Sequence, residues 1–337
     1  MQRTMVESPP REPASGRPPA VEASGLVKTY AEVEAVRGID LAVRAGELFG
    51  FLGPNGAGKS TTIKILCTLL RPTAGRARVA GFDVVGERDE VRRHIGLVFQ
   101  ETTLDDHLTA EQNLRFHAEI YGMPRGAVAG RIDVVLEMVG LADRRGSTVR
   151  TFSGGMKRRL EIARGLLHSP RVLFLDEPTI GLDPESRATL WRYVDQLRAE
   201  EDITVFLTTH YMDEAERCDR IAIIDSGRIG ALDTPSALKA SVGHDRVRVV
   251  TTDDDAAEVA VRERLGVETT RESGALVVLT PDGEQFVPRL FELGLTVRSV
   301  SVARPTLDDV FLAYTGARMA DRQAAAGRRP LPRGARP

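Results

Sequence analysis

The chain has 337 residues, of which 42% are hydrophobic, so it is long enough to form two domains around sizeable cores. Its 46 basic and 48 acidic residues give a net charge of −2, which offers no electrostatic reason to expect a nucleic-acid partner. The two cysteines, Cys67 and Cys218, have neither metal-binding spacing nor a disulfide framework, and no apolar run approaches the ~20 residues that span a bilayer.

Residues 1–22 contain five prolines among small and polar residues, a composition that predicts a disordered N-terminal segment. Further along, the apolar run Leu48–Leu52 predicts a buried strand. Ile63, Leu66 and Leu70 then recur at the spacing of a helix. The predicted order is therefore strand, loop and helix.

The loop between them has the sequence Gly53-Pro54-Asn55-Gly56-Ala57-Gly58-Lys59-Ser60 and fits the phosphate-binding pattern G-x-x-x-x-G-K-[ST] at every fixed position. Its glycines allow backbone N–H groups to turn toward a polyphosphate at the positive end of the following helix. Lys59 would reach the β- and γ-phosphates, and Ser60, with Thr61 beside it, would ligate Mg²⁺. We therefore predict that residues 53–61 bind a nucleotide.

A second helix start of this kind lies near the middle of the chain. Ser153, Gly154 and Gly155 precede a stretch from Arg158 to His168 in which apolar residues recur at helical spacing. A helix that begins in this way presents free N–H groups to an anion. One nucleotide needs only one such cradle, so the second requires its own explanation.

The next apolar run, residues 171–175, ends in two carboxylates, Asp176 and Glu177. It predicts a fully buried parallel strand that delivers both acids at its carboxyl end, where nucleotide sites lie in open α/β sheets. Asp176 would hold Mg²⁺, directly or through water. Glu177 would orient or deprotonate the attacking water.

Residues 243–316 predict a small α+β domain in the order β-α-β-α-β. Its strands are expected at residues 246–251, 275–279 and 297–302, and its helices at 256–265 and 286–293. The acidic run Asp253–Asp255 is more typical of a charged turn before a helix than of a metal site. The remaining tail, 317–337, has six arginines against one acid and is predicted to be disordered and solvated.

In this order the motifs resemble those of the ATP-binding subunits of ABC transporters, over roughly residues 23–242. The segment Thr151–Lys157 is similar to their signature motif, which closes over the γ-phosphate held by the loop of a second subunit. The resemblance implies an α/β fold, a P-loop NTPase of ABC ATPase type. It would combine a mixed sheet core with antiparallel β and helical subdomains, the helical one at about residues 105–150. It also implies a head-to-tail dimer around two Mg-ATP, with Ser153, Gly154 and Gly155 contacting nucleotide.

Four more residues enter through the resemblance alone. Tyr30 matches the aromatic residue that stacks on adenine, and Asp183 the loop that contacts the partner across the dimer. Gln100 matches the glutamine that touches Mg²⁺ and the water, and His210 the histidine that contacts the γ-phosphate. The implied catalytic residues are Glu177, His210 and Gln100. The implied metal ligands are Ser60, Gln100 and Asp176.

The segments Pro305–Gly316 and Gln100–Asp106 resemble one exporter branch, which contains the daunorubicin/doxorubicin-resistance ATP-binding subunits. The resemblance implies an ATPase at the cytoplasmic face of the cell membrane that drives export of a hydrophobic drug, antibiotic or lipid-like compound. Its partners would be a second ATP-binding subunit, in the simplest case a copy of this chain, and a separately encoded permease. An importer subunit, and a soluble ABC ATPase acting on ribosomes or DNA, remain alternatives.

Overall fold

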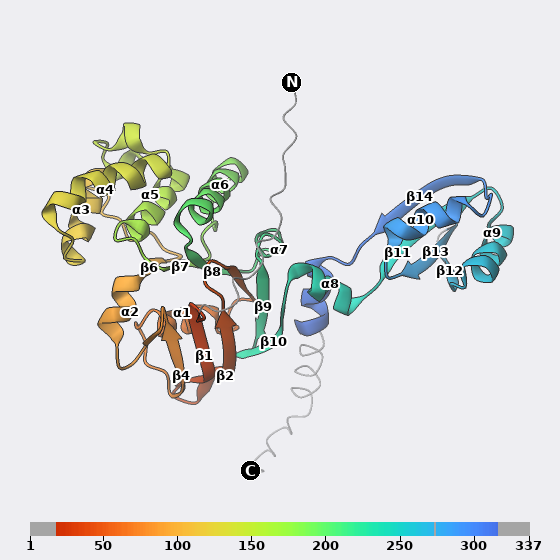
Figure 1. Cartoon of the computed structure of the whole chain (residues 1–337), viewed down its shortest axis with the longest axis horizontal. Helices are drawn as coiled ribbons and strands as arrows, with labels where there is room; N and C mark the ends of the chain where they lie inside the picture. The colour runs from red at the N-terminus through yellow and green to blue at the C-terminus, as the bar shows by residue number, and fades with distance from the viewer. Residues whose placement is uncertain (1–17, 273, 316–337) are drawn as a thin grey trace, which may run out of the picture. The chain divides into compact units, whose positions relative to one another are not determined.

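The computed structural model describes residues 18–272 and 274–315 (Figure 1). The predictions of disorder for residues 1–17 and for the basic tail therefore lie outside the described residues. Within the described part, the first strand begins at Val21, two residues before the predicted boundary, and Val21 is fully buried. The chain divides into two compact units, and the division falls between Leu232 and Asp233.

The first unit contains two β-sheets. The larger sheet has the strand order β10-β9-β3-β8-β7-β6, and the smaller one β2-β1-β4-β5. The larger sheet consists of β3 (Leu48–Leu52), β6 (Ile95–Val98), β7 (Val172–Asp176), β8 (Thr204–Thr209), β9 (Arg220–Asp225) and β10 (Arg228–Asp233). The smaller sheet consists of β1 (Val21–Tyr30), β2 (Val33–Val43), β4 (Ala74–Val79) and β5 (Phe82–Asp83) and is antiparallel.

The pairs β3–β8, β3–β9, β7–β8 and β6–β7 are all parallel. Their carboxyl ends consequently meet at one edge of the sheet, which is where open α/β folds bind ligands. All residues of β3, β7 and β8 are buried, as expected for central parallel strands. Phe206 of β8 packs against Phe49, Phe51 and Phe174, with ring centroids 5.4–5.6 Å apart.

The helices of the first unit are α1 (Lys59–Leu66), α2 (Arg88–His94), α3 (Ala110–Ile120), α4 (Arg125–Met138), α5 (Gly154–Leu166), α6 (Pro184–Glu201) and α7 (Met212–Ala215). Short 3₁₀ turns occupy Ala142–Arg144 and Val149–Thr151. Figure 1 shows α3, α4 and α5 gathered on the opposite side of the unit from β1, β2 and β4. Helix α5 begins at Gly154, directly after Ser153, which is four residues earlier than the predicted helix.

The second unit is an antiparallel sheet of order β12-β13-β11-β14 with helices α9 and α10. Its elements are α8 (Pro235–Val242), β11 (Asp245–Thr251), α9 (Asp254–Ala260) with a π-helical turn (Val261–Leu265), β12 (Thr269–Glu272), β13 (Ala275–Thr280), α10 (Gly283–Phe291) and β14 (Val297–Ala303), and residues 307–315 are helical. The predicted order lacks β12. This strand lies at the sheet edge with its polar residues largely exposed, so no apolar alternation marks it.

The unit division also differs from the predicted boundary at residue 242. Helix α8 groups with the second unit, because its end is close to the helical residues 307–315. Ser241 Oγ lies 3.5 Å from the hydroxyl of Tyr314, and Gly243 faces Pro305. The core of the second unit is formed by Val247, Val249, Val261, Val278, Phe286 and Leu290.

Candidate functional site

The glycine-rich loop leaves β3 and enters α1 through backbone positions that admit no other residue. A Cβ on Gly53 would lie 2.3 Å from the carbonyl oxygen of Ile224. Gly58 has φ +107°, and a Cβ there would lie 2.5 Å from the carbonyl oxygen of Ala35. The loop opens on a cavity of about 300 Å³ lined by Ala35, Pro54, Asn55, Gly56, Gly58, Lys59, Ser60, Thr61, Gln100 and Glu177.

Lys59 is the buried cation of this cavity, with only 4% of its side chain exposed. Its ammonium group donates hydrogen bonds to the carbonyl oxygens of Gly53, at 2.7 Å, and Pro54, at 3.3 Å. It also lies 3.2 Å from Glu177 Oε1. A polyphosphate in the cavity would therefore meet a fixed positive charge at the start of α1.

Asp176 and Ser60 come together as the phosphate-loop interpretation requires. Ser60 Oγ lies 3.4 Å from Asp176 Oδ1, and the same carboxylate oxygen accepts a 2.5 Å hydrogen bond from Thr208 Oγ1. A hydroxyl and a carboxylate are the hard oxygen donors that Mg²⁺ prefers. The chemistry of this donor pair therefore fits the metal.

Glu177 follows Asp176 in a strained backbone conformation. Its φ is +48°, which is uncommon for a residue other than glycine, and such strain persists only where neighbouring groups fix it. Its backbone N–H lies 3.1 Å from both the carbonyl and the hydroxyl oxygen of Thr208. Its carboxylate lies between Lys59 and His210, whose Nδ1 is 3.4 Å from Glu177 Oε1. Three predicted residues thus converge beside the cavity.

The cavity is not lined by Tyr30, Ser153, Gly154, Gly155 or Asp183. Tyr30 ends β1 with 44% of its surface exposed, and the Lys28 ammonium lies 5.3 Å from its ring centroid. Ser153 caps α5 by accepting from the N–H of Met156, at 3.2 Å, and Asp183 caps α6 in the same way. The two helix starts touch, since a Cβ on Gly155 would lie 2.4 Å from Ser186 Oγ.

Comparison with known proteins agrees with this geometry. Residues 36–180 match the ABC transporter family, and residues 234–315 match the C-terminal domain of DrrA1-3-like ATP-binding proteins. The daunorubicin/doxorubicin resistance ATP-binding protein DrrA of Streptomyces peucetius is 45% identical, over 88% of this chain and 92% of its own length. The chain belongs to the drug-resistance branch of ABC transporter ATP-binding proteins.

Two further relatives of this ABC protein are informative. The linearmycin resistance ATP-binding protein LnrL of Bacillus subtilis is 38% identical, over 89% of this chain and all of its own length. A dimeric ATP-binding cassette solved in a post-hydrolysis state with ADP and phosphate aligns with a TM-score of 0.57 and 29% identity, over 64% of this chain and 98% of its own. The predicted ABC ATPase fold is confirmed, and the chain is an ATP-binding ATPase of the drug-exporter type.

Several buried polar residues of the ABC site have no motif of their own. Thr208 is fully buried and reaches Asp176 only because β7 and β8 pair in that register. Glu214 accepts hydrogen bonds from Thr179 Oγ1 and, at 2.6 Å, from Thr209 Oγ1, and so connects the segments after Glu177 and before His210. Burial raises the pKa of Glu214. Thr208 and Glu214 could have been found only from the way in which distant segments pair and pack, which the sequence motifs do not reveal.

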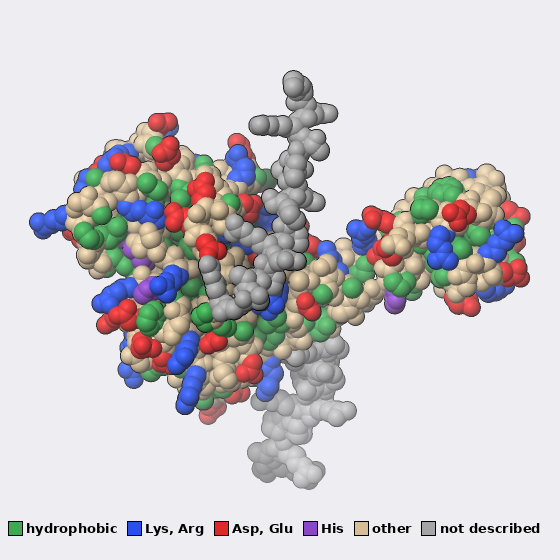
Figure 2. Space-filling model, viewed as in Figure 1, with side chains coloured by type: hydrophobic (Ala, Val, Ile, Leu, Met, Phe, Trp, Pro, Cys, Tyr) green, Lys and Arg blue, Asp and Glu red, His purple; other side chains and the backbone are tan. Residues whose placement is uncertain are grey.

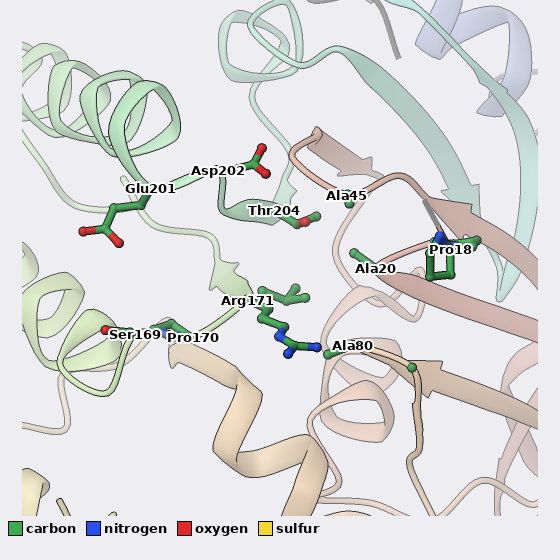
Figure 3. Close-up of a pocket in the computed structure, with 13 residues that line it drawn as sticks. Pro18, Ala20, Ala45, Ala80, Ser169, Pro170, Arg171, Glu201, Asp202 and Thr204 are labelled. Atoms are coloured by element: carbon green, nitrogen blue, oxygen red, sulfur yellow. The ribbon is translucent and has the colours of Figure 1, made fainter. Parts of the chain in front are cut away.

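A second cavity of the first unit lies away from these groups. It has a volume of about 500 Å³ and is lined by residues that include Arg171, Glu201 and Thr204. Arg171 extends toward Ala80 across it (Figure 3). Arg171 and Thr204 lie at the amino ends of β7 and β8. This cavity is therefore at the other end of the parallel strands from Asp176 and Glu177.

The acidic run Asp253–Asp255 begins helix α9 and does not form a separate turn before it: Asp253 is the N-cap, and Asp254 and Asp255 lie in the first turn. Asp253 accepts from the N–H of Ala256 at 3.1 Å, and Asp254 accepts from Thr251.

Among residues 18–272 and 274–315, no cluster of His, Cys, Asp and Glu is arranged to hold a metal on its own. In the same ranges no helix has both the length and the apolar character needed to cross a bilayer. Acidic and basic side chains are interspersed on the face of the first unit that Figure 2 shows.

Proposed function

We propose that two copies of this ATPase pair head to tail around two Mg-ATP and drive a separate membrane permease. One observation carries the proposal. Lys59, Ser60 and Glu177 line one cavity, and Asp176 contacts Ser60 beside it. Ser153, Gly155 and Asp183 do not line this cavity, although the chain has both groups. A head-to-tail partner would bring the second group to the first. The dimeric ADP-bound cassette supports this arrangement, and the presence of both groups in one chain favours a homodimer.

Each residue at the cavity then has a role in phosphoryl transfer. Ser60, Gln100 and Asp176 would hold Mg²⁺, which would supply positive charge against the triphosphate. Lys59 and the amides of residues 53–61 would bind the triphosphate oxygens. Tyr30 would stack on adenine from its exposed position at the end of β1.

Glu177 is the candidate group for activating water. Its carboxylate is buried, and Lys59 and His210 flank it within 3.4 Å, which fixes its direction. It would accept a proton from water as the water attacks the γ-phosphorus, while the bond to the ADP oxygen breaks. His210 and Gln100 would contact the γ-phosphate. The partner's signature residues would close the remaining side.

The relatives support the proposed kind of cargo. Their names describe resistance to daunorubicin, doxorubicin and linearmycin, which supports export of a hydrophobic antibiotic or a lipid-like compound.

Phe116 and Ile120 of α3 are each more than 60% exposed, which supports a docking surface on the helical subdomain for the permease. The ATPase would then work at the cytoplasmic face of the cell membrane. We further propose that residues 243–316 form an accessory domain.

The variant Glu177→Gln tests the proposed function. It should bind ATP and form a stable dimer in size-exclusion chromatography, while phosphate release falls by at least about 100-fold, as expected for loss of a general base. Glu137→Gln, which changes an exposed carboxylate on α4, is the matched control and should behave as wild type. Near-normal turnover of Glu177→Gln, or a monomer with ATP bound, would contradict the proposal. Affinity purification from native membranes should recover an integral membrane protein with wild-type chain.

A further inference from the structure

A buried arginine in α5 contacts the backbone on both sides of Glu177, the proposed general base. Arg158 has 6% of its surface exposed. Its Nε donates to the carbonyl of Pro178 at 2.7 Å, its Nη2 to the carbonyl of Asp176 at 3.2 Å, and its Nη1 to the carbonyl of Phe99. The first two carbonyls flank Glu177 in the chain, and the third belongs to the residue before Gln100. One guanidinium group therefore holds the backbone on both sides of Glu177 and next to Gln100.

The charge of Arg158 is balanced by a second buried group. Glu161, fully buried one turn further along α5, accepts from Arg158 Nη1 at 3.1 Å through Oε2. Its other oxygen accepts from the N–H of Thr103 at 2.8 Å. The pair thus satisfies its own charge, and Glu161 adds a further attachment, to the segment that follows Gln100. A lysine could not reproduce these contacts, because its ammonium lacks the planar fork of five donors.

We infer that Arg158 is a positioning residue that sets the direction of Glu177 and Gln100 and ties both to helix α5. The left-handed backbone at Glu177 needs surrounding contacts to hold it, and Arg158 supplies two of them. Ser153, the N-cap of helix α5, faces the partner's ATP in the proposed dimer, so the inference rests on the proposed function. Engagement of the partner's ATP at the start of α5 would then be transmitted to the carboxylate of the chain's own site.

The variant Arg158→Lys tests the inference, and Arg159→Lys is its matched control. Arg159 is the next residue of α5 and also donates to backbone carbonyls, those of Val139 and Gly140, but these lie in the helical subdomain. Arg158→Lys should lower kcat by about 10- to 100-fold, the cost of misplacing a catalytic group by about 1 Å. Its ATP affinity, measured with a fluorescent ATP analogue, should stay within about threefold of wild type, since only transition-state groups are displaced. Arg159→Lys should keep its kcat.

A loss of ATP affinity in proportion to kcat, an unchanged kcat in folded Arg158→Lys, or an equal loss in Arg159→Lys would each overturn the inference. If Arg158→Lys does not fold by its thermal transition, the double variant Arg158→Gln with Glu161→Gln replaces it, because it removes both buried charges together. The same kcat loss is expected there. Arg158→Lys combined with Glu177→Gln should still give the ATP-bound dimer. Failure of Glu177→Gln alone to dimerise would instead count against the proposed function.

Discussion

The hydroxyl of Thr208 donates a 2.5 Å hydrogen bond to Asp176 Oδ1, across the paired strands β7 and β8. The same hydroxyl oxygen lies 3.1 Å from the backbone nitrogen of Glu177. A single buried side chain thus orients the proposed metal ligand and supports the strained residue that follows it. Outer contacts of this kind fix the direction in which a carboxylate meets its metal.

Replacing Thr208 with valine should weaken the response to Mg²⁺ while the fold is kept. Valine has nearly the same shape, but Asp176 loses a donor, so the Mg²⁺ concentration for half-maximal ATPase activity should rise by about 10- to 100-fold. Thr208→Ser keeps the hydroxyl and should stay close to wild type. A Mg²⁺ titration of phosphate release measures the effect, and an identical curve for the valine variant would remove Thr208 from this role.

Lys59→Ala should lose most of the affinity for ATP. The substitution removes charge-assisted hydrogen bonds to phosphate, and a loss of about 3 kcal/mol of binding free energy corresponds to a roughly 100-fold higher Kd. Lys64, exposed on the same helix α1, provides the control variant Lys64→Ala. Isothermal titration with ATP measures both. Equal affinity of Lys59→Ala and wild type would refute the phosphate-loop assignment.

Local sequence was enough to predict the elements that hold the phosphate loop. The run Leu48–Leu52, the glycine pattern and the apolar run before Asp176 each depend on residues close together in the chain, and the structure has β3, α1 and β7 there. The run Ala275–Leu279 was likewise marked by its own composition and forms most of β13.

The contacts of Arg158, Thr208 and Glu214 could not be predicted in the same way. Each residue has a contact, formed by strand pairing or helix packing, with a residue 18 or more positions away, such as Arg158 with Asp176 and Glu214 with Thr179. The edge strand β12 was missed because it has polar, exposed residues. The division at residue 233 and the predicted boundary at residue 242 differ by the length of α8, whose contact with Tyr314 joins residues far apart in the sequence.

Two glycine substitutions should affect different properties of the protein. Gly58→Ala should lower the affinity for ATP, and Gly130→Ala should raise the stability of the fold. Gly58→Ala places a methyl group 2.5 Å from the carbonyl of Ala35 at φ +107°, so the loop must shift and ATP affinity should fall. Gly130 lies exposed in α4 with open space around its Cα. Gly130→Ala should therefore raise the free energy of unfolding by about 0.5–1 kcal/mol and leave ATP affinity unchanged. Urea unfolding and ATP titration of both variants test this, and a loss of stability in Gly130→Ala would contradict it.

The helical subdomain has a titratable contact that should make its stability depend on pH. Glu111, in the first turn of α3, accepts from Arg145 Nε at 2.6 Å and Nη2 at 3.0 Å, and from Arg115 Nε at 2.7 Å. The hydrogen bonds from Arg145 and then Arg115 lower the pKa of Glu111 to about 2. Because the folded pKa is depressed, this contribution to stability is complete above the unfolded pKa of about 4.3 and is lost as the pH falls toward 2.

Glu111→Gln should therefore destabilise the protein at pH 7 by about 1 kcal/mol, a value kept small because Arg145 is partly exposed to solvent. Glutamine does not titrate, so the difference from wild type should shrink between about pH 4 and pH 2 as the wild-type carboxylate is protonated. Urea unfolding at pH 7 and near pH 3 measures this difference, with Glu137→Gln on α4 as the exposed control. A difference that stays constant over this range would show that Glu111 acts through packing and not through its charge.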